Sequence, residues 1–239
     1  MRGDFGHGSR SVPAMKLLSL NLGRPEAVDY TDQPDGVTGI DKRPVEGPVR
    51  VTAPGAKGTG ASGLAGDAVC DMRHHGGDDQ AVYAFAREDL DSWERTLGRT
   101  LPSGTFGENL TTEGVDVCGA KIGERWRIGP DLLLEVSASR IPCKTFQGHL
   151  GEKTWVKRFT QEKRPGAYLR VIEPGEIRAG DAIEIVRRPA HEVTVAFEFR
   201  ALMTERELLP RVLAAGDALH GEVERVAREY VRKYGEQGR

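Results

Sequence analysis

Short runs of apolar and β-branched residues, each ended by glycine, proline or aspartate, fill most of this chain up to Pro189. The segment from Gly36 to Gly66 is the densest example, with pieces such as VTGI and PVRVTA set between glycines and prolines. Such punctuation is typical of short strands joined by tight turns. It predicts a mainly β fold, a barrel or a sandwich, and argues against a βαβ sheet.

The strand-like runs give a starting point for the domain. The first fourteen residues, MRGDFGHGSRSVPA, offer almost nothing to bury, so we expect a flexible extension over 1–14. The run MKLLSLNL follows, and RWRIGPDLLLEVSAS, AYLRVIE and IRAGDAIEIVRR read as later strands. One stretch, AVYAFAREDLDSWERTLG, predicts a strand that runs into a helix, because Leu90, Trp93 and Leu97 recur at helical spacing before Gly98. It is the only helix that we expect before Pro189.

The character of the chain changes after Pro189. TERE at Thr204 to Glu207 resembles a capping box in front of a short or kinked helix. An amphipathic helix is predicted from Asp217 to Gly235. We therefore expect a β-barrel domain over 15–189 and a helical domain over 190–239. A unit this small should pack on the barrel or on a second copy of the chain in a homodimer.

Composition excludes several classes of protein. A formal net charge of −2 and a pI near 6.3 argue against nucleic-acid binding. No run approaches the length of a membrane span and the start lacks a secretory signal, so we expect a cytoplasmic protein without a membrane partner. The three cysteines are widely spaced and are expected to be free thiols: Cys70, Cys118 and Cys143.

Cys143 has the most distinctive surroundings of the three. It follows an apolar run in SASRIPCKTF, and Pro142 favours an extended Ile141, so the thiol should lie on a loop at the end of a strand. Arg140 and Lys144 would favour its thiolate form if they lie close. The alternative is that Cys143 is a small buried hydrophobic residue, which is how Cys70 and Cys118 are interpreted.

Four further segments carry candidate site residues. In MRHHGGDDQAVY, extended backbone would direct only one of His74 and His75 into a site, and Gly76 and Gly77 permit close backbone approach. Each segment also has a purely structural interpretation, as a turn or a solvated surface. The remaining candidates are Glu108 and Asn109 in GTFGENLTTEGV, Lys42 in TGIDKRPV, and Arg164 before a Pro-Gly turn.

The order of these segments resembles that of the MOSC family, named for the C-terminal domain of molybdenum-cofactor sulfurases. The resemblance covers about residues 36 to 188 through TGIDKRPV, HHGGDDQAVY, FGENLTTEGV, IGERWRIG, LEVSASRIPC, GAYLRV and GD. The tail from 190 to 239 is similar to the three-helix domain of bacterial members of the 6-hydroxylaminopurine-reductase type. One departure stands out: relatives commonly carry a proline and a cation after His-Gly-Gly, where this chain has Asp78, Asp79 and Gln80.

The resemblance implies a β-barrel that binds the molybdenum cofactor (molybdopterin), a phosphorylated pterin whose dithiolene holds the metal, with no pyridoxal phosphate. It implies that Cys143 is the thiolate ligand of molybdenum and the catalytic residue. His75, Gly76, Gly77, Glu108, Asn109 and Arg140 are assigned to the cofactor pocket, with Lys42 and Arg164 expected at the pterin phosphate. The implied reaction reduces N-hydroxylated compounds to amines, and a separate reductase supplies the electrons because no flavin, haem or iron–sulfur motif is visible.

Two other functions stay open on the sequence. One is a non-catalytic carrier of the cofactor or of a sulfur species, which needs the same pocket and thiolate. The other is a cofactor-free thiol hydrolase or transferase that uses Cys143 with His75 and Asn109.

Overall fold

The strands predicted from the alternating runs form one large mixed sheet in the computed structural model, which describes residues 14–235. Its order is β12-β8-β9-β10-β6-β7-β1-β4, and every neighbouring pair is antiparallel except β6 and β7. The eight strands are β1 (Lys16–Gly23), β4 (Lys42–Pro44), β6 (Val82–Ala86), β7 (Leu110–Glu113), β8 (Arg125–Ile128), β9 (Leu132–Ser139), β10 (Ala167–Glu173) and β12 (Ile183–Arg187). Two small sheets pair β2 (Glu26–Ala27) with β3 (Val37–Thr38) and β5 (Val49–Val51) with β11 (Gly175–Ile177).

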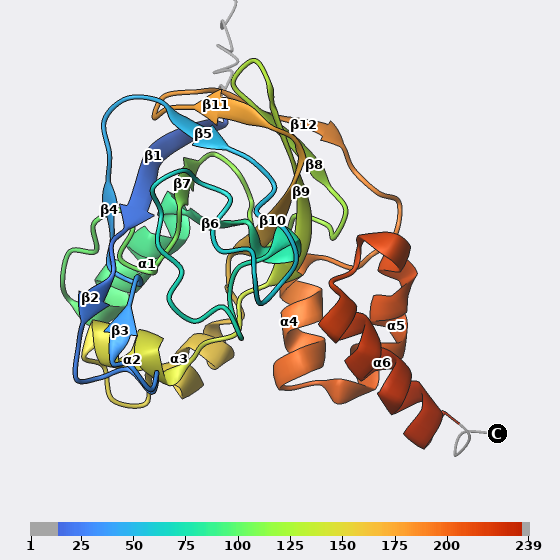
Figure 1. The fold of residues 1–239 in the computed structure, drawn as a ribbon. Coiled ribbons are helices and arrows are strands. Elements are labelled where there is room, and N and C mark those ends of the chain that lie inside the picture. Colours follow the sequence, from blue (N-terminus) through green and yellow to red (C-terminus); the bar gives the residue numbers. More distant parts are fainter. Residues whose placement is uncertain (1–13, 236–239) are drawn as a thin grey trace, which may run out of the picture.

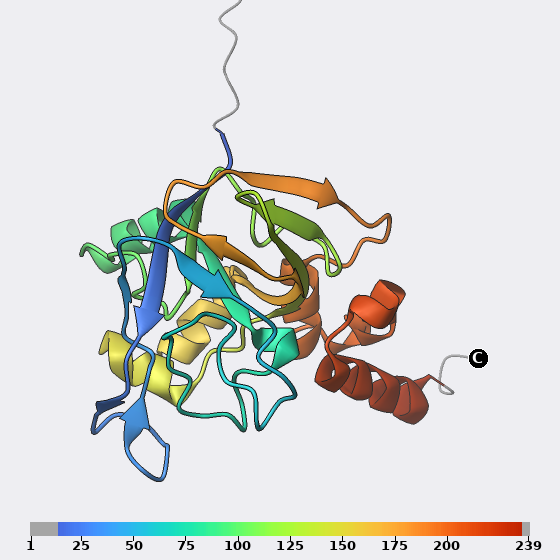
Figure 2. The same ribbon diagram turned by 45° about the horizontal axis from the view of Figure 1, so that its top comes forward.

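The large sheet closes on itself near the start of β1. Lys16 forms an antiparallel bridge with Ala182, and the Leu17 N–H donates to the Asp181 carbonyl at 2.8 Å. Closure of this kind removes most of the exposed strand edge, and its interior is filled by apolar side chains such as Leu20, Trp126 and Leu134. The expected mainly β barrel is confirmed (Figures 1 and 2).

Six α-helices accompany the barrel in the described residues: α1 (Arg87–Leu97), α2 (Lys144–Leu150), α3 (Trp155–Glu162), α4 (Val195–Met203), α5 (Leu209–Val212) and α6 (Gly221–Tyr234). Short 3₁₀ turns lie at Asp78–Gln80 (η1), Arg206–Leu208 (η2) and Leu213–Ala218 (η3). The helix over α1 was predicted, including its end, since Gly98 adopts a left-handed φ of 67°. Helices α2 and α3 were not predicted, and the expectation of a single helix before Pro189 was wrong.

The C-terminal helices share the barrel's core. The Val195 N–H donates to the Ala120 carbonyl at 2.9 Å, and α4, α5 and α6 add Val195, Val212 and Ala227 to the same apolar cluster. Both views show the three helices grouped at one side of the strands (Figures 1 and 2). Strand β12 ends at Arg187 and α4 begins at Val195, on either side of the boundary expected at 189/190. The extension expected over 1–14 lies outside the described residues except for Ala14.

The short or kinked helix expected after TERE is confirmed, because η2, α5 and η3 follow one another there with a kink at Gly216. The capping box is wrong, because Thr204 is the C-cap residue of α4 and no side chain caps the start of η2. None of the described helices is both long and apolar enough to cross a membrane.

A second core of aromatic side chains joins the helices under the site. Phe106 is fully buried, with ring centroids of neighbouring aromatics 5.0 to 6.2 Å away. The surrounding rings come from β6 and from α1, α2 and α3: Phe85, Trp93, Phe146, Trp155 and Phe159. This cluster fixes α2, and with it the loop that precedes α2.

Candidate functional site

A cavity of about 310 Å³ is lined by loops that connect the barrel strands. Four stretches far apart in sequence meet there, around residues 31–42, 62–83, 107–109 and 140–145, together with Tyr168 of β10. Six of the residues predicted from the sequence line it: Lys42, His75, Gly76, Asn109, Arg140 and Cys143. Gly77, Glu108 and Arg164 do not. The structure therefore brings most of the predicted residues into one place.

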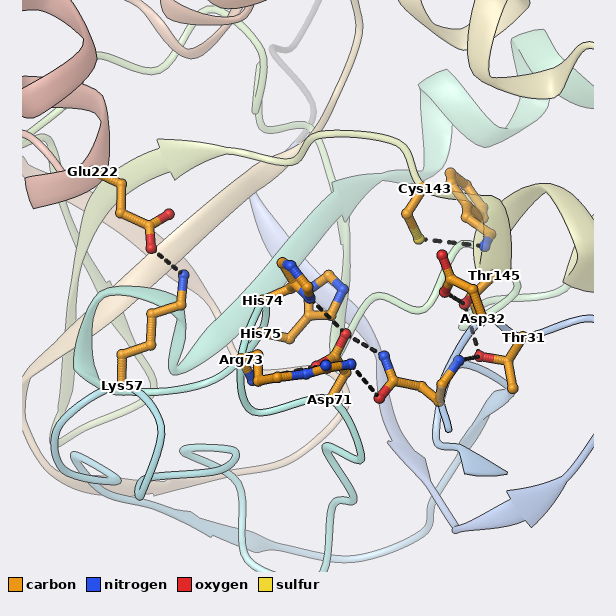
Figure 3. A network of polar contacts seen from close by, with 12 residues as sticks. Thr31, Asp32, Lys57, Asp71, Arg73, His74, His75, Cys143, Thr145 and Glu222 are labelled. Carbon is orange, nitrogen blue, oxygen red and sulfur yellow. Dashed lines mark hydrogen bonds and ion pairs between the residues drawn. The ribbon is translucent and has the colours of Figure 1, made fainter. Parts of the chain in front are cut away.

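Cys143 lies between the end of β9 and the start of α2, as the position of Pro142 predicted. Its backbone is extended, with φ −127° and ψ 173°, and its sulfur accepts the Phe146 N–H at 3.4 Å (Figure 3). The side chain is half-buried. The sulfur thereby caps the start of α2, where the first N–H groups have no partner inside the helix.

Arg140 places a positive charge under the cavity. The residue is only 4% exposed, and its guanidinium lies 4.2 Å from the ring centroid of Phe146 and 5.0 Å from that of Tyr83. It donates to the Phe106 carbonyl, while its Nε has no partner among the described residues. A buried cation without a carboxylate partner is costly unless an anion meets it. The thiolate of Cys143 or an anionic ligand would supply that charge.

Lys42, by contrast, already has a counter-charge. Its ammonium pairs with Asp67, and both side chains are buried. Asp67 also accepts the Gly23 N–H at 2.7 Å and the Asn109 side-chain amide at 2.9 Å. Burial lowers the pKa of Lys42, and the Asp67 carboxylate opposes that shift. Lys42 and Asn109 thus belong to a fixed polar network in the wall of the cavity.

His75 lies inside the site in its neutral form. Its Nδ1 is 3.1 Å from the Tyr168 hydroxyl, and burial, with a contribution from Arg140, lowers its pKa to about 4. His74 lies at the more exposed mouth, where it contacts Asp71 at 2.8 Å. The backbone is a turn here and not extended, so both histidines reach the cavity.

Gly76 and Gly77 have a packing role that the sequence suggested. Both have positive φ, and a Cβ on Gly76 would lie 2.5 Å from the Ala61 carbonyl oxygen. A Cβ on Gly77 would lie 2.7 Å from Lys57 Cα. The pair lets the loop before β6 pack against residues 57–61, although only Gly76 reaches the cavity.

Glu108 and Arg164 lie elsewhere. Glu108 is fully buried and holds its own turn, accepting from the Gly104 N–H at 2.6 Å and the Phe106 N–H at 3.0 Å. Arg164 forms an ion pair with Asp89 and does not face the cavity. The structure therefore gives no support to placing Glu108 or Arg164 in the pocket, because each already has protein partners.

Several residues in the cavity wall were missed from the sequence. Cys70 lines it, although burial and the nearby Asp35 carboxylate raise the pKa of its thiol, which favours the neutral form. Tyr83 and Tyr168 contribute aromatic faces with ring centroids 5.2 Å apart. Their strands were predicted, but which side of each strand faces the cavity depends on barrel closure.

The loop between β2 and β3 lies over the mouth of the cavity. The Gln33 amide donates to the Asp71 carboxylate, and the Thr31 and Thr145 hydroxyls are 2.9 Å apart (Figure 3). These contacts join the loop to the segment that carries the histidines and to the first turn of α2. The mouth is thereby bordered by three separate segments.

Two types of site are not formed by the described residues. Nowhere in residues 14–235 do three or more His, Cys, Asp or Glu side chains gather as a ligand set for a metal ion. A hydrogen-bonded thiol triad is also missing from this region, because His75 bonds to Tyr168 and Asn109 bonds to Asp67 and the Tyr83 backbone instead of joining Cys143.

Comparisons with known proteins agree with the fold. Residues 71–184 match the family described as "MOSC domain". The "Uncharacterized protein YflK" of Bacillus subtilis is 34% identical over 184 residues, covering 77% of this chain and 79% of that protein. A protein named "Reductase" from Gibberella moniliformis is 32% identical over 54% of this chain but only 23% of its own length. The crystal structure of YiiM from Geobacillus stearothermophilus superposes with a TM-score of 0.71 at 26% identity, covering 90% of this chain and 98% of that one.

Proposed function

Because the chain belongs to the MOSC domain family, we propose that it binds the molybdenum cofactor in this cavity and reduces N-hydroxylated compounds to amines. The observation that carries the proposal is the presence, in the wall of one cavity, of a half-buried thiol that accepts a backbone N–H and a buried guanidinium that has no carboxylate partner among residues 14–235. The name of the fungal relative supports oxidation–reduction chemistry.

The residues present fit such a group. A dithiolene-bound metal brings its own sulfur ligands, so one protein thiolate suffices, and Cys143 is the better donor because Cys70 is held in the neutral form. Arg140 offers the only buried cation of the cavity without a carboxylate partner in the described chain, since Lys42 is matched by Asp67. We therefore assign the anionic part of the cofactor to Arg140 in place of Arg164.

The proposed reaction is R–NHOH plus two electrons and two protons, giving R–NH₂ and water. When bound, the cofactor would supply the electron transfer, and a separate reductase would refill it. The chain's own residues hold the reactants: Tyr83 and Tyr168 form apolar walls, and neutral His75 with Tyr168 offers a hydrogen-bonded pair to a polar substrate. The β2–β3 loop is held at the cavity by its contacts with Asp71 and Thr145.

The test compares wild type with Cys143→Ala and Cys70→Ala, all purified from a host that makes the cofactor. We expect near-stoichiometric molybdenum and reduction of an N-hydroxylated base with an artificial electron donor in wild type and Cys70→Ala. Cys143→Ala should lose both. Loading without turnover in wild type would favour the carrier function, and metal-free wild type, purified beside loaded host enzymes, would refute the proposal.

A further inference from the structure

The β2–β3 hairpin, residues 24–38, borders the cavity without joining the barrel sheet. Strand β2 pairs with β3 and with no other described strand, and both views show the hairpin projecting from the barrel (Figures 1 and 2). None of residues 24–37 is buried, whereas other parts of the cavity wall carry buried side chains such as Lys42, Asn109 and Arg140. A two-stranded hairpin alone is marginally stable, and segments with few buried contacts open at low cost in free energy.

Both ends of the hairpin meet at a narrow neck. A Cβ on Gly23 would lie 2.2 Å from the Gly39 carbonyl oxygen, and a Cβ on Gly39 would lie 2.4 Å from the Ala68 carbonyl oxygen. The Gly23 N–H donates to Asp67, which also pairs with Lys42. Because this neck is fixed and the two strands beyond it pair with each other, the hairpin can swing as one unit about residues 23 and 39.

Side-chain contacts hold the far end of the hairpin against α2. Besides the contact between the Thr31 and Thr145 hydroxyls, the Tyr30 hydroxyl lies 3.5 Å from His149 Nδ1. The Tyr30 side chain also packs on Gly148, where an added Cβ would lie 2.5 Å from Tyr30 Cβ. Glycine is unfavourable inside a helix, and here it leaves the space that the tyrosine occupies.

These contacts reach the helix that begins at Cys143. Cys143 is the N-cap residue of α2, and Thr145 follows two residues later, so Thr31 and Asp32 of the hairpin lie beside the thiol's own segment (Figure 3). We propose that the β2–β3 hairpin is a lid that swings about Gly23 and Gly39 to admit bulky ligands to Cys143. The lid acts on any ligand too large for the closed mouth, and it therefore goes beyond the proposed function.

The test measures how fast Cys143 of cofactor-free full-length protein reacts with two maleimides of different size. N-ethylmaleimide is small and fluorescein-5-maleimide is bulky, while both form the same thioether with a thiol. Peptide mapping by mass spectrometry reports Cys143 separately from Cys70 and Cys118. The lid is locked by a disulfide between the thiols introduced by Thr31→Cys and Thr145→Cys, because the two native hydroxyls are 2.9 Å apart. The double variant Thr31→Ser with Thr145→Ser is the matched, unlocked control.

We expect the lock to slow the bulky maleimide at Cys143 by about tenfold or more relative to the small one, because it removes the open state through which the bulky reagent enters. The ratio of the two rates cancels any change in the nucleophilicity of the thiol. The unlocked control should match wild type. An equal ratio in locked and wild-type protein, or a wild-type Cys143 that reacts with the small reagent alone, would overturn the proposal.

Two further variants open the lid instead of locking it. Gly148→Ala places a methyl group where Tyr30 packs, and Tyr30→Ala removes the ring without changing α2. Both should raise the relative rate of the bulky maleimide at Cys143. Gly221→Ala, at the first residue of α6, is the control, because a Cβ there would meet nothing within 4 Å. Rates no higher than wild type in both opening variants would contradict the closed contact.

The maleimide rates do not depend on molybdenum. Metal-free wild type from a cofactor-producing host would refute the proposed function and leave the lid standing. A ratio unchanged by the lock would refute the lid and leave the proposed function standing.

Discussion

Replacing Glu198 by glutamine should change how the stability of this protein depends on pH. Glu198 lies on α4 and is fully buried behind the site, where its Oε1 accepts from the Ser139 N–H at 3.0 Å and from the Ser139 hydroxyl at 3.1 Å. Oε2 has no partner among the described residues. Burial raises the pKa of this carboxyl to about 7 from an ordinary value of 4.5.

The size of the effect follows from the two pKa values. One pKa unit corresponds to about 1.4 kcal/mol, so ionising Glu198 costs about 3 kcal/mol more in the folded protein than in the unfolded chain. Below the unfolded pKa both states are protonated and nothing is lost. As the pH rises, the unfolded chain releases its proton first, so the free energy of unfolding falls until the pH passes about 7. Glu198→Gln keeps the acceptor for Ser139 and cannot ionise.

Urea unfolding followed by tryptophan fluorescence between about pH 5 and about pH 8 measures this difference. Glu198→Gln should gain on wild type by roughly 2–3 kcal/mol across the range. Glu184→Gln, on the exposed face of β12, is the matched control and should run parallel to wild type. Parallel curves for Glu198→Gln and wild type would refute the argument from burial.

Three other predictions concern the packing and charges around the cavity. Phe106→Ala should lower the free energy of unfolding by about 3–5 kcal/mol in urea titrations, because it leaves a void among the aromatic rings of β6, α1, α2 and α3. A loss under about 1 kcal/mol would contradict the aromatic core. Lys42→Met should lower the free energy of unfolding by about 3–5 kcal/mol in thermal unfolding, because it leaves the buried Asp67 carboxylate without its counter-charge. The double variant Lys42→Met with Asp67→Asn should recover part of this lost stability, and no recovery would contradict the ion pair. The His75 imidazole should stay neutral in NMR titrations until the pH falls toward about 4. Because the unfolded chain takes up this proton first, the free energy of unfolding should fall as the pH drops from 6.5 toward about 4. A titration midpoint near 6.5 would contradict the burial of His75.

The strands and two of the helices could be predicted because their patterns are local. Strand β1 and the strand–helix pair β6–α1 follow from alternation and from helical spacing ended by Gly98. Helix α2 has only seven residues, including Gly148 and His149, and owes its stability to the aromatic rings packed against it, which no local pattern contains. TERE correctly indicated the short, kinked helix that follows it, but Thr204 does not cap that helix, because it is the C-cap residue of the preceding helix α4.

The site was predictable where one short segment carries the chemistry. Cys143 with Arg140, and His75 with Gly76, were found because neighbouring residues stay together in the fold. The interpretation of the other cations depended on distant partners: Asp67 neutralises Lys42, and Asp89 neutralises Arg164. Partners brought together by barrel closure cannot be read from a single sequence, nor can the cavity-facing positions of Cys70 or Gln80.

The central claim is that Cys143 supplies a thiolate to molybdenum, and X-ray absorption at the molybdenum edge tests it most directly. Cys143→Ser is the suitable variant, because a serine hydroxyl can still accept the Phe146 N–H at the start of α2. Protein from a cofactor-producing host should show one sulfur ligand fewer in Cys143→Ser than in wild type, with an oxygen in its place. An unchanged sulfur shell at equal metal content would contradict the account.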